Sequence, residues 1–153
     1  MGQRRQAKKT LRADAAAVVE TCAGLQSRLA ARRITQFLDR EMAGGGLSTA
    51  QLGLMAHVVA AADDTLGALA QRTGLDQSTL SRNLRALETD GLVEIAIVES
   101  DLRRRMVWLT ETGARRLEQA IPLWRAAHAK LAKRLSTDFV HRAANEAEKL
   151  IQE

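Results

Sequence analysis

The first half of the chain carries apolar residues at the three- and four-residue spacing that is typical of amphipathic helices. Residues 13–42 are strong helix formers, and their apolar positions fall on one face. This face consists of Val18, Cys22, Leu25 and Leu29. The three glycines at 44–46 are expected to end the helix. Ser48 and Gln51 then form a capping box, the pattern that begins a second helix. Its apolar positions are Leu52, Met55 and Val59.

Two short helices come next, on either side of a glycine turn. Thr65 is expected to cap a helix over residues 66–72. After the turn, either Asp76 or Ser78 caps another helix, which runs to about Thr89. We expect this pair of helices to form a helix-turn-helix.

A two-stranded hairpin is predicted after these helices. Val93–Val98 is rich in β-branched residues, which favours a strand. We expect residues 99–102 to form the loop and residues 104–109 the returning strand. Two short helices followed by a hairpin describe a winged helix-turn-helix.

A long helix is expected after Thr110, because apolar residues recur there every four and three positions. This heptad seam consists of Leu117, Ile121, Trp124, His128, Leu131 and Leu135. Such a seam is typical of a helix that packs against a partner helix, and Pro122 is expected to kink it. A last helix begins at Ser136 or Asp138.

The predicted fold is therefore mainly α with a small β-hairpin. It is a winged helix-turn-helix domain with dimerisation helices at both ends. The expected parts are a basic disordered arm (1–12), an N-terminal dimerisation helix (13–45), the winged domain (46–110) and C-terminal dimerisation helices (111–153).

The net charge of +5 is confined to the first twelve residues. Residues 1–12 hold five of the 23 basic residues and no acid, which leaves 18 basic and 18 acidic residues in the rest of the chain. The arm either attracts phosphates or serves as a solubilising terminus, and both interpretations stay open. Evidence for nucleic-acid binding must therefore come from the positions of the charged residues in the rest of the chain, 13–153.

Several classes of protein are not expected from this composition. No apolar run is long enough to span a bilayer, so we expect no membrane partner and a cytoplasmic location. A single cysteine excludes a disulfide framework and a cysteine-based zinc site. His57, His128 and His141 lack ligand spacing, so we expect no metal. Without a glycine-rich phosphate loop or paired catalytic carboxylates, we expect no cofactor and no enzyme activity.

The helix after the turn presents a polar face opposite its leucines. On a helical wheel, Leu80, Leu84 and Leu87 face the core. The exposed face and its flanks hold Gln77, Ser78, Thr79, Ser81, Arg82 and Arg85. Small side chains at the N-terminal end allow close approach to bases, and backbone N–H groups there can meet phosphates. Arg82 can either bind guanine with two hydrogen bonds or hold a phosphate. The alternative is an ordinary solvated helix face.

The hairpin carries three consecutive arginines. They are Arg103, Arg104 and Arg105, and Asp101 precedes them. An arginine at the tip of a wing can enter the minor groove of DNA, and Asp101 can orient Arg103. Strand alternation predicts that Arg103 and Arg105 point one way and Arg104 the other. A charged edge strand that resists aggregation is the alternative.

Residues 48–124 resemble the MarR family of bacterial transcription regulators. The matching stretches begin at Thr65 (Thr-Leu-Gly-Ala-Leu-Ala), Gln77 (Gln-Ser-Thr-Leu-Ser-Arg), Leu87 (Leu-Glu-Thr-Asp-Gly-Leu-Val), Asp101 (Asp-Leu-Arg) and Leu109 (Leu-Thr-Glu-Thr-Gly). The resemblance implies a homodimer whose terminal helices interlock, with Val18, Leu25 and the heptad seam at the interface. It also implies that each subunit presents one winged domain to double-stranded DNA. Ile95 and Ala96 depart from the family, in which the first wing strand often begins with basic residues.

The resemblance also suggests what is sensed. Cys22 lies in the helix where the hydroperoxide-sensing branch of the family carries its reactive cysteine. This chain lacks the tyrosines of that branch, so structural packing is favoured over redox sensing. The family further implies a pocket for a small aromatic or phenolic ligand. Its candidate lining residues are Met42, Met55, His57 and Trp108.

The function expected from the sequence is a ligand- or oxidant-responsive repressor. It would bind a pseudo-palindromic operator as a homodimer, with half-sites about one helical turn apart. The alternative is a winged scaffold that binds another protein without enzymatic activity.

Overall fold

A computed structural model describes residues 9–61 and 65–151, apart from the side chains of Lys9, Val98, Leu102 and Arg103. The chain forms two compact units, Met1–Gln36 and Phe37–Glu153. In the described residues the elements are seven α-helices, one short 3-10 helix and a two-stranded antiparallel hairpin. The predicted fold class, mainly α with a small β-hairpin, is confirmed.

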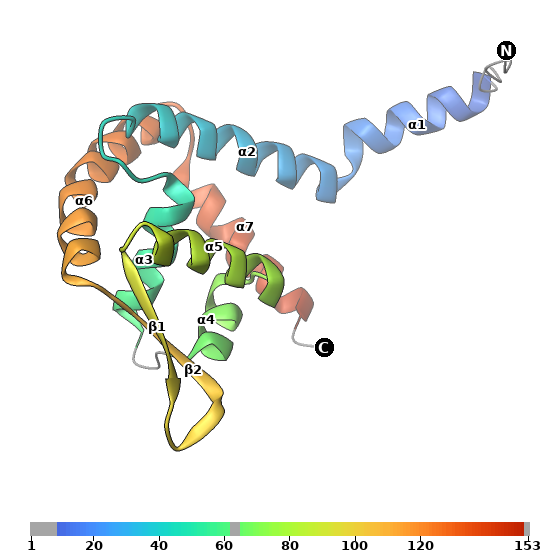
Figure 1. The fold of residues 1–153 in the computed structure, drawn as a ribbon. Helices are drawn as coiled ribbons and strands as arrows, with labels where there is room; N and C mark the ends of the chain where they lie inside the picture. The colour runs from blue at the N-terminus through green and yellow to red at the C-terminus, as the bar shows by residue number, and fades with distance from the viewer. Residues whose placement is uncertain (1–8, 62–64, 152–153) are drawn as a thin grey trace, which may run out of the picture. The chain divides into compact units, whose positions relative to one another are not determined.

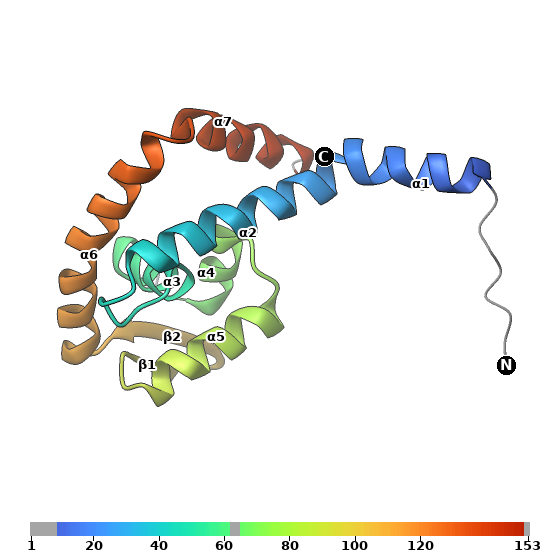
Figure 2. The same ribbon diagram turned by 90° about the horizontal axis from the view of Figure 1, so that it is seen from above.

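The first unit contains α1 (Lys9–Thr21) and most of α2 (Ala23–Glu41). One continuous helix over 13–42 was expected, and this is wrong because the helix breaks at Cys22 (Figure 2). The Gln26 side-chain amide donates to the carbonyls of Val19 (2.8 Å) and Glu20 (3.4 Å). These carbonyls would accept from residues 23 and 24 in an unbroken helix, so Gln26 satisfies them where the ladder stops.

The predicted disordered arm also needs correction. Lys9–Arg12 form the first turn of α1, so they are not disordered. These residues are good helix formers that continue into the alanine-rich stretch. Residues 1–8 of the arm lie outside the described part of the chain.

The second unit begins with the end of α2 and α3 (Thr49–Ala60). The capping box of Ser48 and Gln51 is confirmed. Asp39 Oδ1 also accepts a hydrogen bond from the Thr49 amide at 2.6 Å, which holds the start of α3 against α2. The expected inward position of Val59 is wrong, because Val58 is buried and Val59 is exposed.

The helix-turn-helix consists of α4 (Leu66–Thr73) and α5 (Gln77–Thr89). Thr65 caps α4, and Asp76, one of the two expected residues, caps α5. Gly74 ends α4 with a φ of +66°, a left-handed conformation that glycine adopts without strain. The three leucines of the predicted inner face of α5 are buried, as expected.

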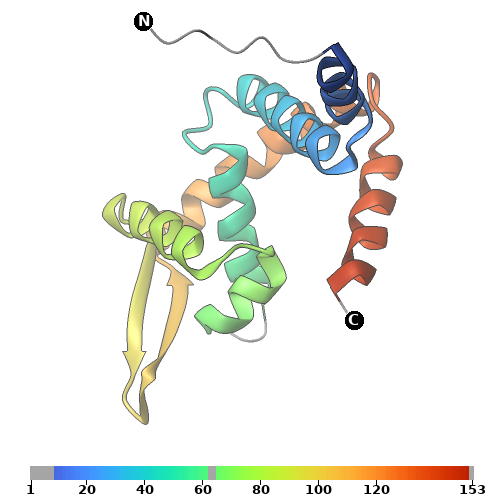
Figure 3. The ribbon, with the colours of Figure 1, turned by 90° about the vertical axis from the view of Figure 1, so that its right-hand side faces the viewer.

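The hairpin consists of β1 (Val93–Val98) and β2 (Asp101–Leu109). Val93 pairs with Leu109 at its base, and Val98 pairs with Asp101 near its tip. The loop is therefore two residues shorter than expected, with Asp101 and Leu102 already in β2. The pairing is irregular between Ile97 and Val98, and an isolated bridge joins Thr65 to Met106 on the other edge of β2. The hairpin projects from the helices of this unit (Figures 1 and 3).

The chain ends with α6 (Glu111–Ala132), α7 (Thr137–Glu148) and η1 (Lys149–Ile151). The helix α6 continues through Pro122 and is curved in Figure 2. Near its end, Lys130 Nζ donates to Glu41 Oε2 at 2.5 Å, which joins α6 to the end of α2 and holds the pKa of Glu41 below its usual range. By contrast, α7 has no buried residue.

The predicted heptad seam of α6 faces its own chain in part. Leu117 and Leu131 are only 6% and 7% exposed in a single chain, so they have almost no surface left for a partner helix. Both residues are therefore better explained as part of the core of the second unit. The half-buried seam residues are Ile121, Trp124, His128 and Leu135.

The base of the hairpin is held at one junction. Thr110 Oγ1 donates to the Gly91 carbonyl at 2.6 Å and accepts from the Gly113 amide at 2.9 Å. The Thr110 amide donates to the Leu92 carbonyl at 3.1 Å. A Cβ on Gly113 would lie 2.8 Å from the carbonyl carbon of Leu92 and nearer still to its oxygen, so only glycine fits there.

We predict that Gly113→Ala destabilises the protein by about 1–3 kcal/mol, because the added methyl group forces the backbone of Leu92 aside. Urea denaturation followed by circular dichroism measures this change. Gly53→Ala is the matched control, since a Cβ there meets nothing within 4 Å and alanine favours the helix. Equal stability of the two variants would contradict the role of the junction.

Candidate nucleic-acid interface

The N-terminal end of α5 is organised by Asp76. Its Oδ1 accepts from the Ser78 hydroxyl (2.7 Å) and the Thr79 amide (2.8 Å), and its Oδ2 accepts from the Thr79 hydroxyl (2.8 Å). The hydrogen bond from Ser78, followed by those from Thr79, holds the pKa of Asp76 well below its usual range. The carboxylate therefore stays ionised at neutral pH.

This network changes one expectation for the helix. We expected backbone N–H groups at this end to be available to phosphates, but the Thr79 amide is bound to Asp76. The negative charge of Asp76 also repels a phosphate. Contacts to DNA phosphates are therefore expected elsewhere on this surface.

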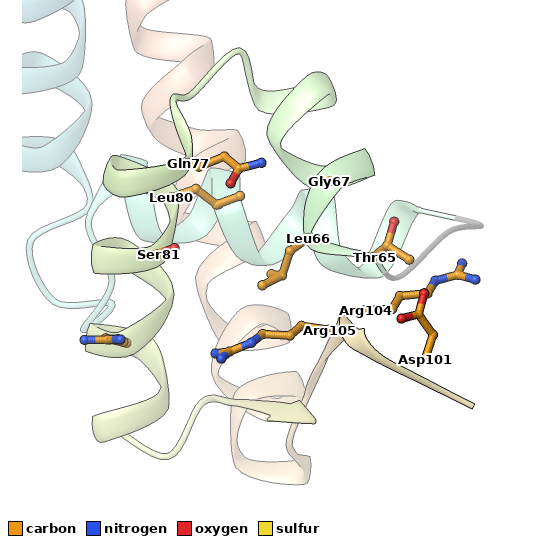
Figure 4. A pocket seen from close by; sticks show the side chains of 10 residues that line it. Thr65, Leu66, Gly67, Gln77, Leu80, Ser81, Asp101, Arg104 and Arg105 are labelled. Carbon is orange, nitrogen blue, oxygen red and sulfur yellow. The ribbon is translucent and has the colours of Figure 1, made fainter. Parts of the chain in front are cut away.

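A groove of about 750 Å³ lies between the start of α4, α5 and β2 (Figure 4). Its charged lining residues are Arg85, Arg104, Arg105 and Asp101. Its other lining residues are Thr65, Leu66, Gly67, Gln77, Leu80 and Ser81. Three arginines against one aspartate make the groove cationic, which favours phosphate.

Two rows of side chains face each other across this groove. Gln77, Ser81 and Arg85 come from one side of α5 at four-residue spacing. From β2, Arg105 extends toward α5, whereas Arg104 lies beside Asp101 near Thr65 (Figure 4). Arg104 and Arg105 thus point to opposite sides, as strand alternation predicts, and the side chain of Arg103 lies outside the described part of the structure.

The predicted DNA-contacting residues are thus divided between two surfaces. Six of them line the groove: Gln77, Ser81, Arg85, Asp101, Arg104 and Arg105. Ser78, Thr79 and Arg82 do not line it, and Ser78 and Arg82 are exposed. Thr65, Leu66 and Gly67 also line the groove, and none of them was predicted to do so. The capping signal at Thr65 marks the start of α4 next to the wing.

The predicted ligand-pocket residues are not brought together. Met42 and Met55 are 1% and 0% exposed in the core, whereas His57 is exposed on α3. Trp108 is exposed on β2, where its Nε1 donates to Glu94 Oε2 of the neighbouring strand at 3.0 Å. None of these four lines the groove or a second cavity of about 330 Å³ between α3 and α5. That second cavity is lined by Ser48, Ala50, Gln51, Leu54, Asn83, Ala86 and Leu87.

The remaining candidate for sensing is Cys22, which is half-buried at the break between α1 and α2. Among the described residues, no group of three or more histidine, cysteine, aspartate or glutamate side chains is placed to hold a metal ion. The helices in the described ranges are all too short or too polar to cross a membrane.

Comparisons with known proteins agree with this geometry. The model of the MarR family matches residues 45–104. The transcriptional regulator MosR of M. tuberculosis, solved in complex with DNA, is similar with a TM-score of 0.76 and 31% identity over 86% of this chain and 99% of that chain. Wild-type MarR of E. coli in its apo form has a TM-score of 0.62 and 25% identity over 84% of this chain and 96% of that chain. No curated protein matches the chain.

We predict that Asp76 contributes less to stability at acidic pH than at neutral pH. Because its pKa is lowered from 3.8, the carboxylate contributes fully above that value, and its contribution is lost as the pH falls through the lowered pKa. The difference in Tm between the wild type and Asp76→Asn should therefore be constant at neutral pH and shrink below about pH 4. Thermal denaturation from neutral to acidic pH measures this difference. A difference that does not change with pH would contradict the network.

Proposed function

The chain belongs to the MarR family of transcription regulators, and we propose that it is a DNA-binding repressor that acts as a homodimer. One observation carries the proposal: the arginine-lined groove lies beside the exposed polar face of α5 in a winged-helix fold. In such folds the second helix of the helix-turn-helix enters the major groove. MosR, which shares this fold, was solved in complex with DNA. Relatives of this family are transcription regulators, not enzymes.

In this proposal the groove and the exposed face of α5 bind different parts of the DNA. Arg85 and Arg105 hold phosphates of the strand that passes between α5 and the wing, because guanidinium groups bind phosphate oxygens with charge-assisted hydrogen bonds. Arg82, exposed and outside the groove, contacts a base edge. Arg103 enters the minor groove at the wing. The phosphate contacts supply affinity, and the base contacts supply sequence preference.

Exposed apolar side chains on the terminal helices support the homodimer. They are Leu11, Val18 and Val19 on α1, Leu25 on α2, and Phe139 and Val140 on α7. The helix α7 has no fully buried residue within its own chain, and a short helix with little packing is marginal in water. A second copy that covers these residues presents two α5 helices to a pseudo-palindromic operator.

The signal in this proposal is a small ligand or an oxidant. Either one changes the spacing of the two α5 helices in the dimer and thereby releases DNA. Cys22 is the candidate for the oxidant, because it is accessible in part at the break between α1 and α2. A small aromatic or phenolic compound is the candidate ligand.

We predict that Phe139→Asp weakens the dimer more than a hundredfold. Burial of a phenylalanine side chain contributes about 1.5–3 kcal/mol, and two-fold symmetry counts it twice. Sedimentation equilibrium measures the dissociation constant. Val59→Asp is the matched control, because Val59 on α3 is 61% exposed and Phe139 is 59% exposed. If Phe139→Asp remains as dimeric as the control, α7 does not belong to the interface.

We predict that Arg85→Ala and Arg105→Ala each weaken binding to operator and scrambled DNA by similar factors. In a homodimer each variant removes two phosphate contacts, one from each subunit, so the slope of log K against log salt becomes less steep by about 1.8. Fluorescence anisotropy over a range of salt concentrations measures both quantities. Arg115→Ala is the control, since Arg115 lies on α6, pairs with Glu111 and does not line the groove. An unchanged salt slope in both groove variants would exclude the groove as the phosphate site.

A further inference from the structure

The strand β1 forms a free edge of the hairpin. Within the described residues the sheet has two strands, so β1 pairs with β2 alone. The other edge of β2 is bridged to Thr65, whereas no strand lies along the outer edge of β1 in the described ranges (Figure 3). In an antiparallel pair, alternate residues direct their N–H and C=O groups to the partner strand, and the others direct theirs outward. The outer edge of β1 therefore offers backbone donors and acceptors to a further strand.

The sequence of β1 favours pairing at this edge. It reads Val-Glu-Ile-Ala-Ile-Val, which is rich in β-branched residues and contains no proline, glycine or lysine. Natural edge strands are usually protected by lysine, proline, a bulge or an inward-pointing charge. Here the irregular pairing between Ile97 and Val98 lies near the tip, so residues 93–97 form a regular stretch. Ile97 is 54% exposed beside this edge.

The single charged residue of β1 is directed to the other strand. Glu94 lies opposite Trp108 in the ladder, and its Oε2 accepts a hydrogen bond from Trp108 Nε1 at 3.0 Å. This hydrogen bond holds the carboxylate over β2. The charge is thus kept away from the free edge, where it would oppose the approach of another strand.

A second copy of β1 is complementary to this edge. When two copies pair antiparallel and continue one sheet, the two-fold axis passes through a central residue, either Ile95 or Ala96. With Ile95 on the axis, Glu94 faces Ala96 of the second copy. With Ala96 on the axis, Ile95 faces Ile97 of the second copy. The two Glu94 carboxylates face each other in neither arrangement, so no like charges oppose the pairing.

This contact is too small to join two dimers in free solution. Two strands of six residues are far below the size of stable interfaces, which bury roughly 1,000 Å² or more. Arg104 and Arg105 on β2 also repel the arginines of a second wing. DNA phosphates neutralise these arginines, and a shared DNA molecule holds neighbouring dimers at a high effective concentration. The contact is therefore expected between dimers on the same DNA.

We propose that the outer edge of β1 is a docking surface for β1 of a neighbouring dimer. Pairing of the two strands makes binding to adjacent operators cooperative, because backbone hydrogen bonds join the second dimer to the first. The inference rests on the proposed function, since it requires homodimers whose wings lie on DNA. It gives the wing a contact to protein in addition to its contact to DNA.

Titration of DNA that carries one or two operators tests the proposal. Selection from a random library of duplexes supplies the operator, and the distance between its two copies is increased one base pair at a time over a full helical turn. At favourable distances we expect the first dimer to raise the affinity of the second about tenfold. About five further base pairs place the dimers on opposite faces of the DNA and should abolish this gain. Absence of cooperativity at every distance would overturn the inference.

The variant Ile97→Lys separates the edge contact from binding to a single operator. Lysine on an edge strand opposes pairing, and the exposed position of Ile97 allows the fold to be kept. Ser100→Lys is the matched control, because it adds the same charge to an exposed turn of the hairpin outside β1. Both variants should bind one operator with similar affinity, and only Ile97→Lys should lose cooperativity. The same cooperativity in both variants, retained or lost, would contradict the role of β1.

A cysteine cross-link then locates the contact. Ile95→Cys and Ala96→Cys are each introduced into a chain with Cys22→Ser and oxidised in the presence of DNA. In a paired sheet, the residue on the two-fold axis lies close enough to its copy to form a disulfide. One of the two variants should cross-link on DNA with two operators and not on DNA with one. If neither variant forms this cross-link, the strands do not pair.

These experiments separate failure of the inference from failure of the proposed function. If the protein does not prefer a single operator to scrambled DNA, both proposals fail. If it binds a single operator selectively but shows neither cooperativity nor the cross-link, only the inference fails. Sedimentation of the protein without DNA should show no species larger than a dimer, and a stable larger species would contradict the requirement for DNA.

Discussion

The wing depends on the close approach of Gly113 to the backbone of Leu92. Because Gly113 has no side chain, the first turn of α6 lies directly against the residues that link α5 to β1. The Thr110 hydroxyl then joins the carbonyl of Gly91 to the amide of Gly113. The end of α5, both strands and the start of α6 meet at this point. The junction thereby sets the direction of the hairpin and the position of Arg105 relative to α5.

The candidate interface has an ionised carboxylate, Asp76, at the start of α5 and a cationic groove along the side of the same helix. A carboxylate near DNA costs electrostatic energy, because it repels phosphates. Arg85 and Arg105 offset this repulsion if they hold the phosphates along the side of α5, away from Asp76. In the proposed complex with DNA, the position of the wing would therefore set where the phosphates lie relative to the start of α5. A hairpin that leaves the junction in another direction would lose this arrangement.

Local signals in the sequence predicted the ends of elements well. The caps at Ser48, Thr65 and Thr110 are confirmed, because each depends on side chains within three residues of the cap. Two errors have other causes. The break at Cys22 involves the side chain of Gln26, and α3 is apolar on so many sides that its pattern does not separate Val58 from Val59. The side of α5 that faces the wing is likewise a tertiary property, which helical periodicity alone does not determine.

The heptad seam of α6 shows why periodicity does not identify a partner. An apolar seam indicates that a helix packs, but Leu117 and Leu131 are buried by their own chain. In α7, by contrast, all of the apolar residues remain exposed within one chain. Its twelve residues are too few for a stable isolated helix in water. The folding of α7 is therefore coupled to whatever covers it, and if that is a second copy, the stability of this helix rises with protein concentration.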